Sequence, residues 1–489
     1  MRILRTLSAL ALVGAMAGLA AVGDQVSVPG QVPAEGLSHT VQVPAGLTTL
    51  VCAAAPELSD AVIDVDDEFA QEIGDAVTAL NAFSFPRTGA SGAATLGVLG
   101  GAAAELRDAG ELHEFSELNE QAPTVLTVQP VGDIAGLAAG TSIFRVDAGD
   151  LRSISAAPCV SPSSDLWLVG GSGEIGHTAT LTLANPGRTP ATVDVELFGP
   201  LGAIDAPLLQ GIVLAPGTST DLLLGSHAAD VASLAAHVTS SGAGITATIA
   251  YSQIDGFTPQ GFDIVTPSVA PTTSLLIPAI PLTEAFTAGG GASPSATAEG
   301  SAVRIVNPSE ESAFVTVTLL GDSGPVAISG ATNVEISPSA VFEVSLAGLP
   351  PGDYALQIDS DVAVTAGAVL SRGSGERDQS WVPAVSGNAL ATGAVAGADR
   401  LLVTAPEAAT VTVTRWDDEG TLLGEETLEI AVATTVAVDL DEAAAVLVAS
   451  SAPVISGAVY EVLDGALLSI MPLTPDANES HTVTIRPIN

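Results

Sequence analysis

A pattern of turn and strand residues recurs along the chain at matched offsets. The pair Asn185-Pro186 precedes an alternating run at residues 191–197, and Asn307-Pro308 precedes a second run at residues 313–319. A shorter third copy begins at Ala405-Pro406. Offsets that match over such lengths are the signature of a repeated structural unit. We therefore expect this part of the chain to fold as three copies of one unit.

Within each copy, apolar and polar residues alternate. In the first copy Val193, Val195 and Leu197 alternate with Asp194 and Glu196. Successive side chains of a strand point to opposite faces, so the apolar set faces a core and the acids face water. Units of about 100 residues built from such strands are typical of immunoglobulin-like sandwiches. The sequence predicts a mainly-β fold of tandem immunoglobulin-like antiparallel β-sandwich domains at residues 164–271, 272–384 and 385–475, followed by a C-terminal tail at 476–489.

A strand that contains proline recurs near each end of these units. It reads as residues 276–280 around Pro278, 381–385 around Pro383, and 470–473 around Pro472. Because the three strands follow the copies in the same order, we expect them to occupy equivalent places in the fold.

The segment at residues 24–163 does not show this repeat. Short strand-like runs lie at its two ends, and between them apolar residues recur at steps of three and four. These residues are Val62, Val65, Phe69, Ile73, Val77 and Leu80. Such spacing favours an amphipathic helix, and residues 102–112 suggest a second one. The sequence predicts an N-terminal β-domain that carries a helical insertion at about residues 57–118.

Residues 1–23 have the form of an export signal. Arg2 and Arg5 precede an uncharged, mostly apolar stretch at residues 7–22, and the first acidic residue is Asp24. This order is typical of a secretory signal peptide. The stretch is slightly shorter than the ~20 residues that span a bilayer, and an uncleaved N-terminal anchor stays open as the alternative. In either case we expect the rest of the chain to be secreted or held at the cell surface, with membrane contact only through an uncleaved N-terminal segment.

The chain has two cysteines, Cys52 and Cys159. Disulfides persist in exported proteins, and an even number of cysteines favours a pair. Closing a loop of this length stabilises a fold by about 4–5 kcal/mol in the chain-entropy model. Neither cysteine has a histidine or a second cysteine nearby in the sequence, as a zinc site requires. We therefore predict a structural disulfide between Cys52 and Cys159.

The charge balance excludes one large class of partners. The chain has 13 basic residues, all arginine, against 55 acidic residues, which gives a formal net charge of −42. Nucleic-acid affinity depends on neutralising phosphates with Lys and Arg, and anionic membranes attract the same residues. We therefore expect no nucleic-acid partner and no docking to an anionic membrane surface. A hydrophobic content of 47% also argues against disorder.

The segment at residues 151–159, the following residues 166–171 and the Asn185-Pro186-Gly187 turn resemble an uncharacterised family of exported actinobacterial proteins. The resemblance extends over most of the chain after residue 23. It implies export from a high-GC Gram-positive cell and a location in the cell envelope. The family has no known activity, and the resemblance implies no site residues.

One stretch resembles the nucleophile motif of chymotrypsin-like proteases. Ser323 lies within Gly-Asp-Ser-Gly-Pro, and His237 and Asp263 precede it in the order that those proteases use. A serine triad needs the three side chains within hydrogen-bond reach of one another. The repeat instead places Ser323 in the turn that Leu201 occupies in the previous copy. We therefore predict no catalytic residue here.

The acidic run at residues 64–68 partly resembles a calcium-binding loop. An EF-hand loop requires glycine at its sixth position, where this chain has Phe69. The acids are better interpreted as the first turn of a helix, where the helix dipole favours negative charge. The six histidines are scattered, without the spacing of a metal site. We predict no metal site and no cofactor.

The three tryptophans differ in their surroundings. Trp167 and Trp381 lie where strands enter the predicted sandwiches, and we expect them to fill cores. Trp416 precedes an acidic turn, and an exposed indole stacks well on a sugar ring. Core packing is the commoner role of a tryptophan and stays open for Trp416, which is the one candidate ligand contact in the sequence.

Together these patterns predict an exported, non-enzymatic scaffold or adhesion-type protein of the cell envelope. A cell-wall glycan or an envelope protein is the expected partner. Two alternatives stay open: a wall-polysaccharide-binding or assembly factor, and a hydrolase with an unrecognised site. The first predicts binding to wall glycans, and the second predicts two or more carboxylates that converge in one pocket.

Overall fold

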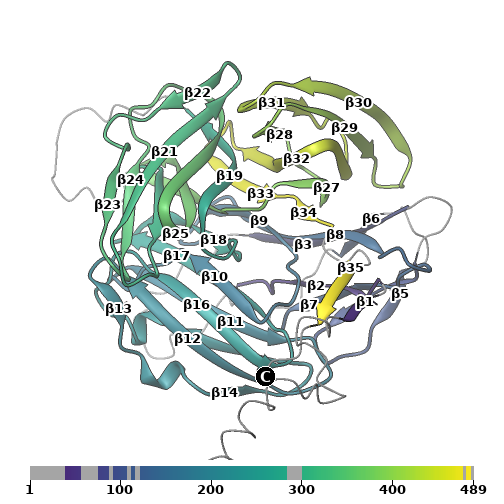
Figure 1. Ribbon diagram of the computed structural model, residues 1–489, viewed down its shortest axis with the longest axis horizontal. Helices are drawn as coiled ribbons and strands as arrows, with labels where there is room; N and C mark the ends of the chain where they lie inside the picture. Colours follow the sequence, from purple (N-terminus) through teal and green to yellow (C-terminus); the bar gives the residue numbers. More distant parts are fainter. Residues whose placement is uncertain are drawn as a thin grey trace, which may run out of the picture. The chain divides into compact units, whose positions relative to one another are not determined.

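Figure 1 shows a computed structural model of the chain, which describes residues 39–43, 45–56, 75–86, 92–106, 112–115, 122–283, 300–476 and 481–485. The chain divides into two compact units, one made of residues 1–44 with 480–489 and the other of residues 45–479. In the first unit, β1 (His39–Val43) pairs antiparallel with β35 (His481–Ile485). The helices within the described ranges are the short 3-10 turns η3 (Pro207–Leu209) and η4 (Leu224–Ser226), and none is long and apolar enough to cross a membrane.

The second unit is built from antiparallel sheets in four pairs, which we call repeats 1 to 4. In repeat 1 the two sheets have the strand orders β2-β7-β4-β5 and β6-β3-β8-β9. Repeat 2 has the same arrangement, with the orders β10-β16-β12-β13 and β15-β11-β17-β18, and β14 also pairs with β12. The strands of repeat 1 are β2 (Thr48–Cys52), β3 (Ala76–Phe85), β4 (Ala94–Val98), β5 (Ala104–Leu106), β6 (Leu112–Phe115), β7 (Thr124–Val128), β8 (Leu137–Val146) and β9 (Ser153–Pro158). Those of repeat 2 are β10 (Asp165–Val169), β11 (His177–Asn185), β12 (Ala191–Gly199), β13 (Gly202–Ile204), β14 (Ile212–Leu214), β15 (Thr218–Leu223), β16 (Ala235–Gly242), β17 (Thr246–Asp255) and β18 (Thr258–Val265).

Repeats 3 and 4 keep this order but join two successive strands into one long strand. β25 pairs first with β19 and β21 in one sheet and then with β20 and β26 in the other. β32 does the same in repeat 4, first with β27 and β29 and then with β28 and β33. The strands of repeat 3 are β19 (Thr272–Leu282), β20 (Ala302–Val306), β21 (Ala313–Gly321), β22 (Gly324–Ala327), β23 (Val334–Ile336), β24 (Val341–Ser345), β25 (Gly352–Ser374) and β26 (Glu376–Pro383). Those of repeat 4 are β27 (Asn388–Ala394), β28 (Arg400–Ala405), β29 (Ala409–Trp416), β30 (Leu422–Ile430), β31 (Thr434–Asp439), β32 (Ala445–Val462), β33 (Leu467–Pro472) and β34 (Thr474–Pro475).

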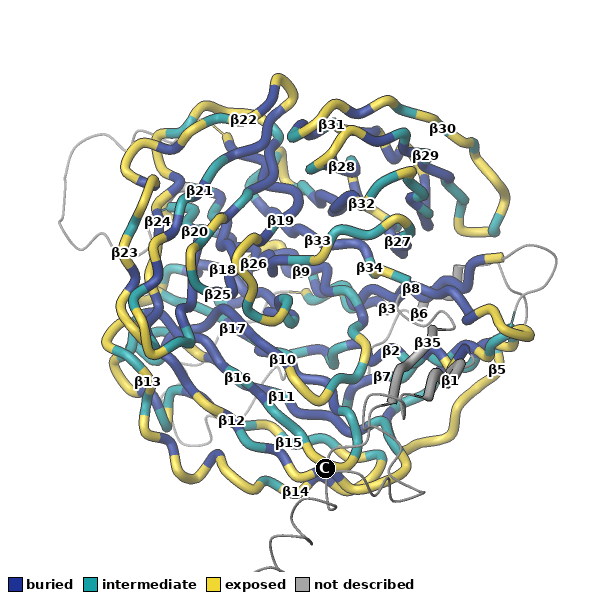
Figure 2. Tube along the Cα trace, viewed as in Figure 1, coloured by how far each residue is buried: buried dark blue, intermediate teal, exposed yellow. Residues whose placement is uncertain are grey.

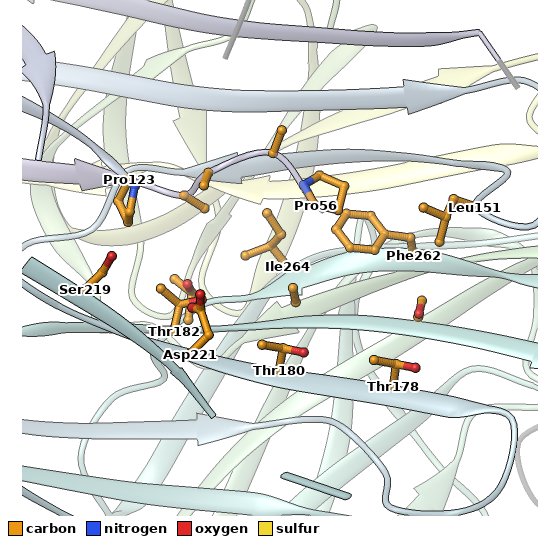
Figure 3. Close-up of a pocket in the computed structure, with 16 residues that line it drawn as sticks. Pro56, Pro123, Leu151, Thr178, Thr180, Thr182, Ser219, Asp221, Phe262 and Ile264 are labelled. Atoms are coloured by element: carbon orange, nitrogen blue, oxygen red, sulfur yellow. The ribbon is translucent and has the colours of Figure 1, made fainter. Parts of the chain in front are cut away.

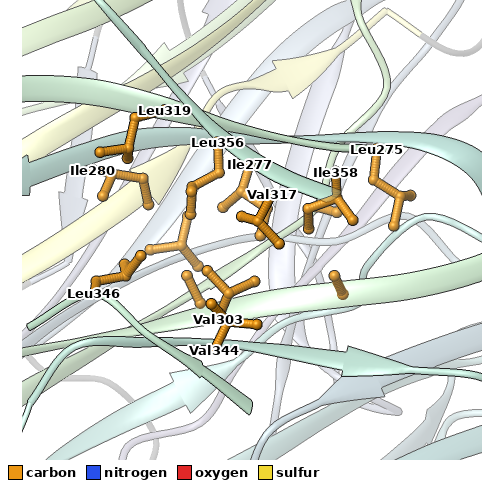
Figure 4. Close-up of a cluster of buried hydrophobic side chains, with 14 of the residues drawn as sticks. Leu275, Ile277, Ile280, Val303, Val317, Leu319, Val344, Leu346, Leu356 and Ile358 are labelled. Carbon is orange, nitrogen blue, oxygen red and sulfur yellow. The ribbon is translucent and has the colours of Figure 1, made fainter. Parts of the chain in front are cut away.

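Each repeat has an apolar core between its two sheets. In repeat 3, Val317 and Leu319 of β21 and Leu356 of β25 meet Val303 of β20 from the opposite sheet (Figure 4). Alternation places the intervening Thr318 on the outer face. Figure 2 shows the same division, with buried residues along the strands and exposed residues in the turns. Burial of each such Val or Leu contributes about 1.5–3 kcal/mol, so the alternation in the sequence accounts for this core.

The described part of the predicted helical insertion consists of strands, and that prediction is wrong there. Val77 and Leu80 lie on β3, where Val77 is 59% exposed and Leu80 is in the core. The reason for the error is that both faces of β3 are covered from Ala79 onward. Leu80 faces the core of repeat 1, whereas Phe83 and Phe85 pack against repeat 4. A strand covered on both faces loses its period-two pattern, and a short apolar run then resembles a helix. Residues 57–74, 87–91, 107–111 and 116–118 of the insertion lie outside the described residues.

The last strands of the four repeats meet at one place, which we call the junction. β9, β18, β26 and β33 contact one another in turn, as Figure 2 shows. The Ala156 N–H of β9 donates to Ser469 Oγ of β33 at 2.8 Å. The Ile470 N–H of β33 donates to Ser380 Oγ of β26 at 2.9 Å. Hydrogen bonds from side chains to backbone therefore join repeats that are distant in the sequence.

The proline strands are equivalent in only part of the predicted set. Pro383 ends β26, Pro472 ends β33, and Pro158 ends β9, all at the junction. Pro278 lies instead inside β19, the first strand of repeat 3, so its expected equivalence is wrong. The counterpart in repeat 2 is β18, which Pro267 follows closely. Proline suits the end of an edge strand because its missing N–H interrupts no further pairing.

The two cysteines form a disulfide within repeat 1. Cys52 ends β2, and Cys159 directly follows β9. Val51 and Val160 exchange two backbone hydrogen bonds beside it, at 2.8 and 2.9 Å. Gly140 of β8 lies against the bridge, and a Cβ there would come within 2.5 Å of Cys159 Sγ. The bridge therefore connects the first strand of repeat 1 to the chain that leaves its last strand.

Candidate functional site

A cleft of about 370 Å³ lies between repeat 1 and the outer face of the β15-β11-β17-β18 sheet of repeat 2 (Figure 3). We call it the threonine cleft, after the three threonines of β11 that line it, Thr178, Thr180 and Thr182. Its volume falls in the range of ordinary small-ligand sites, which is about 300–1,000 Å³.

The alternation of β11 builds the polar wall of this cleft. Ala179, Leu181 and Leu183 point into the core of repeat 2, so the threonines between them point outward. The pairing with β17 places Ser252 beside Thr178 and Thr248 beside Thr182. Rows of hydroxyl groups therefore extend across two neighbouring strands, each able to donate and accept hydrogen bonds.

β15 adds Ser219 and Asp221 to this wall. Asp221 Oδ1 accepts a hydrogen bond from Thr182 Oγ1 at 2.6 Å. Asp221 is the one charged residue among the described residues that line the cleft. The wall therefore offers neutral hydroxyl groups and a single negative charge.

The opposite side of the cleft is apolar. Pro56, Pro123 and Leu151 come from repeat 1 and lie across from the threonines, as Figure 3 shows. Phe262 and Ile264 of β18 lie between the two sides. Phe262 packs edge-on against Phe144 of repeat 1, with ring centroids 5.0 Å apart, which fixes its position. The cleft thus has one hydroxylated side and one apolar side.

The described lining of the cleft carries hydroxyl groups and one carboxyl group, which can bind a polar ligand. A glycosidase uses two carboxyl groups on either side of the scissile bond. The described lining holds one, Asp221, which already accepts a hydrogen bond from Thr182. What the cleft provides is a set of hydrogen-bond partners beside an apolar surface.

The three residues that resemble a protease triad have separate surroundings. Ser323 lies in the exposed turn between β21 and β22, where its hydroxyl donates to Asp322 at 2.9 Å. His237 stacks on Trp167, with ring centroids 4.0 Å apart, and its Nε2 lies 3.1 Å from Asp165. Asp263 is buried at the junction. The contacts of these side chains are therefore not those of a triad.

Trp416 is half-buried, between repeats 4 and 1. Its ring centroid lies 5.6 Å from that of Phe85 and 6.0 Å from that of Phe83. This packing gives the indole a structural role, and a role in ligand contact stays a prediction. Trp167 and Trp381 are 5% and 4% exposed and lie in apolar clusters.

The acidic run at residues 64–68 lies outside the described residues. Within the described ranges, no group of three or more His, Cys, Asp or Glu side chains is placed to hold a metal ion. The threonine cleft was not predicted from the sequence. The Thr-x-Thr-x-Thr pattern of β11 was a usable signal for its polar wall, but the facing wall comes from a distant segment.

Comparison with known proteins gives a family and two distant structures. A family model described as "Family of unknown function (DUF5719)" matches residues 115–441. No curated protein matches the sequence. One similar solved structure, described as "Biofilm associated protein - BSP domain", is 10% identical, covers 89% of this chain and 96% of its own, and has a TM-score of 0.12. Another, described as "Structure of infectious bursal disease virus Gt strain", is 10% identical, covers 94% of this chain and 82% of its own, and has a TM-score of 0.08. At these TM-scores neither structure defines the fold or the function.

Proposed function

The chain belongs to a family of unknown function (DUF5719), and we propose that it is an exported, non-enzymatic scaffold or adhesion-type protein of the cell envelope. The signal-like segment at residues 1–23 supports export, and so does the disulfide, because disulfides persist outside a reducing cytosol. The sheet pairs support immunoglobulin-like sandwiches as the repeated unit, and the resemblance supports an actinobacterial cell as the source.

The observation that carries this proposal is the junction. Separate sandwiches on flexible linkers would move independently, whereas here the last strands of all four repeats contact one another. Side-chain hydrogen bonds at Ser380 and Ser469 join these strands across repeats. A body fixed in this way holds its surfaces at constant positions, which is what a scaffold or an adhesin requires.

Limited proteolysis of the exported protein tests the scaffold. We expect protease to remove terminal segments first and to leave one resistant fragment that contains all four repeats. The controls are N-terminal sequencing of the fragment and of the mature protein from medium and membrane fractions. Release of single repeats as stable fragments, or recovery of the whole chain from the cytosol, would contradict the proposal.

A second candidate function, wall-polysaccharide binding, is favoured by the threonine cleft. A sugar ring has hydroxyl groups at its edge and C–H groups on its faces, and the cleft has a hydroxylated side and an apolar side. Asp221 is the one charged residue of the described lining, and its negative charge disfavours phosphate and uronate groups. The chemistry of the cleft therefore fits an uncharged glycan better than an anionic wall polymer.

A binding panel of neutral and anionic wall polysaccharides tests this second function. Thr180→Val with Thr182→Val keeps the shape of the wall and removes two hydroxyl groups, each worth about 1 kcal/mol in a hydrogen bond. We expect roughly tenfold or greater loss of affinity for a neutral glycan. Thr318→Val, on the outer face of β21, is the matched control and should bind normally. Equal binding by all variants, or a preference for anionic polymers, would contradict the assignment.

A further inference from the structure

Within the described ranges two acidic side chains are buried, both at the junction. Asp263 of β18 is 3% exposed and Asp378 of β26 is 0% exposed. A buried charge is costly unless hydrogen bonds or opposite charges compensate it. Neither residue has a part in the cleft, so their position calls for another explanation.

The Asp263 carboxyl group links three strands of the junction. Its Oδ1 accepts from Ser155 Oγ of β9 at 2.5 Å, and its Oδ2 accepts from the Trp381 N–H of β26 at 2.6 Å. The Ser380 hydroxyl also donates a hydrogen bond to this carboxyl group. Asp263 therefore connects its own repeat to repeats 1 and 3.

The Asp378 carboxyl group links the remaining strand. Its Oδ2 accepts from the Leu468 N–H of β33 at 2.8 Å and from the Ile154 N–H of β9 at 3.3 Å. Its Oδ1 accepts from the Gln379 N–H at 2.9 Å. Together the two carboxyl groups contact all four strands of the junction. Because their oxygens are surrounded by N–H and O–H donors, the pair is not arranged to hold a cation.

The strands of the junction and their pairing partners carry further titratable groups. β18 and β33 carry no titratable side chain except Asp263, and β26 begins with Glu376 and the partly exposed Arg377. The strands that pair with these four carry Arg145 on β8, Tyr251 and Asp255 on β17, Asp353, Tyr354, Asp359, Asp361 and Arg372 on β25, and Tyr460 and Glu461 on β32. Arg152 lies 3.5 Å from Glu376, at the start of β26, and Arg145 lies 2.7 Å from Asp147. Arg372 is the cross-strand neighbour of Asp378, but its guanidinium donates to Pro281 O and lies 3.7 Å from Glu461.

Burial therefore acts on both carboxyl groups, whose described hydrogen bonds come from N–H and O–H groups. It raises the pKa of Asp263 to about 7, although the hydrogen bonds from Ser155 and Trp381 oppose the shift. Burial also raises the pKa of Asp378 well above its usual range, and the negative charge of Asp263 raises it further. An unfolded aspartate has a pKa of about 3.9.

We propose that Asp263 and Asp378 form an acid-stabilised lock that closes the junction when the pair is protonated and loosens it when both carboxyl groups ionise. Below about pH 4 both aspartates are protonated in the folded and in the unfolded protein, so the lock contributes most to stability there. As the pH rises towards 7, the folded state keeps protons that the unfolded state releases, and stability falls. Above the folded pKa values, two negative charges share one dry site and the strands separate more readily.

Urea unfolding at pH 5 and pH 8 tests the lock in the full chain. Ionisation of Asp263 alone should increase the unfolding equilibrium constant by about 100-fold between pH 5 and pH 8. Asp263→Asn with Asp378→Asn should remove most of that change. The general repulsion within a chain of net charge −42 has the same sign, so the control is Asp418→Asn with Glu419→Gln, an exposed pair that removes the same charge. This control should keep the pH dependence, and high salt should not abolish it, because salt screens surface charges far more than buried ones.

Amide hydrogen exchange on the wild-type chain provides a second test, which needs no variant. We expect the Trp381 and Leu468 amides, corrected for intrinsic rates, to lose protection between pH 6 and pH 9. The Val317 amide, inside repeat 3, should keep its protection. Equal pH dependence in the double Asn variant and the wild type, or full protection of the junction amides at pH 9, would overturn the proposal.

Discussion

Repeats 1 and 2 have the same strand order but stabilise it by different means. In repeat 2, β11 ends at Asn185, which is 0% exposed and whose amide donates to Thr189 O at 2.9 Å and to Leu214 O at 3.2 Å. In repeat 1, the equivalent strand β3 ends at Phe85, which packs against Trp416 of repeat 4. Both repeats therefore have the same strand order. The last residue of the equivalent strand stabilises a turn within repeat 2, whereas in repeat 1 it contacts a neighbouring repeat.

The disulfide stabilises repeat 1, and repeat 2 has no cysteine. Cys52→Ser with Cys159→Ser should lower the free energy of unfolding by about 4–5 kcal/mol, because the bridge closes a sequence separation of 107 residues. Urea unfolding of the oxidised protein and the double variant measures the difference. Reduction of the wild type should match the variant, and an unchanged midpoint would show that repeat 1 is held by its core alone.

The close packing of Gly140 against the disulfide provides a second test of the bridge. A Cβ at this position would lie 2.5 Å from Cys159 Sγ and 3.3 Å from Cys52 Sγ. Gly140→Ala should therefore cost about 1–3 kcal/mol in the oxidised protein, as overpacked sites do. In the cysteine-free background the cost should be smaller. The same cost in both backgrounds would show that the methyl group clashes with something other than the bridge.

The asparagine turns should contribute equally in repeats 2 and 3. Asn307 repeats the geometry of Asn185, with its amide 2.7 Å from Glu311 O and 3.2 Å from Ile336 O. Asn185→Ala and Asn307→Ala should each cost about 2–3 kcal/mol, because buried carbonyl groups lose their donors. Thermal and urea unfolding check the values. A cost at one site only would show that the two turns are not equivalent.

Much of the β architecture could be predicted from the sequence where one strand face meets water. Alternation at residues 191–197 and 313–319 indicated strands, and both ranges lie in β12 and β21. The N-terminal β-domain was predicted, but its equivalence to the other repeats was not, because β3 is covered on both faces from Ala79 onward. Phe85-Pro86 nevertheless corresponds to the Asn185-Pro186 and Asn307-Pro308 turns. Repeat 1 lacks the asparagine that precedes this proline in repeats 2 and 3, so the proline directly after the strand was the remaining sign of the repeat.

The junction was harder to predict because its partners are distant in the sequence. Ser155, Ser380 and Ser469 each lie three residues before the proline that ends their strand. Asp263 lies four residues before Pro267 in the remaining repeat. This recurrence marked the strands as equivalent. It did not show that they meet, because alternation describes the two faces of a strand and not which repeat covers them.

Trp416 tests the boundary between repeats 4 and 1. Trp416→Ala should cost about 2 kcal/mol, less than the 3–5 kcal/mol of a fully buried tryptophan, because the side chain is half-buried. Trp416→Phe should recover part of the loss by keeping a ring against Phe83 and Phe85. Glycan binding measured on both variants separates the two roles. Loss of binding by the stable Phe variant would support ligand contact, and unchanged binding would leave Trp416 as a packing residue.

The smallest effect is expected in the β21–β22 turn, which compares repeat 3 with repeat 2. Ser323 is exposed and bonds only to its neighbour Asp322 among the contacts described for it, and repeat 2 has Leu201 in its place. Ser323→Ala should therefore change the free energy of unfolding by less than about 0.5 kcal/mol. Gly324→Ala is the informative control, because its φ of +108°, close to the +123° of Gly202, should make that change cost about 1 kcal/mol or more. Labelling by a fluorophosphonate that Ser323→Ala abolishes would identify the serine as a nucleophile, and the turn would then have a role that repeat 2 lacks.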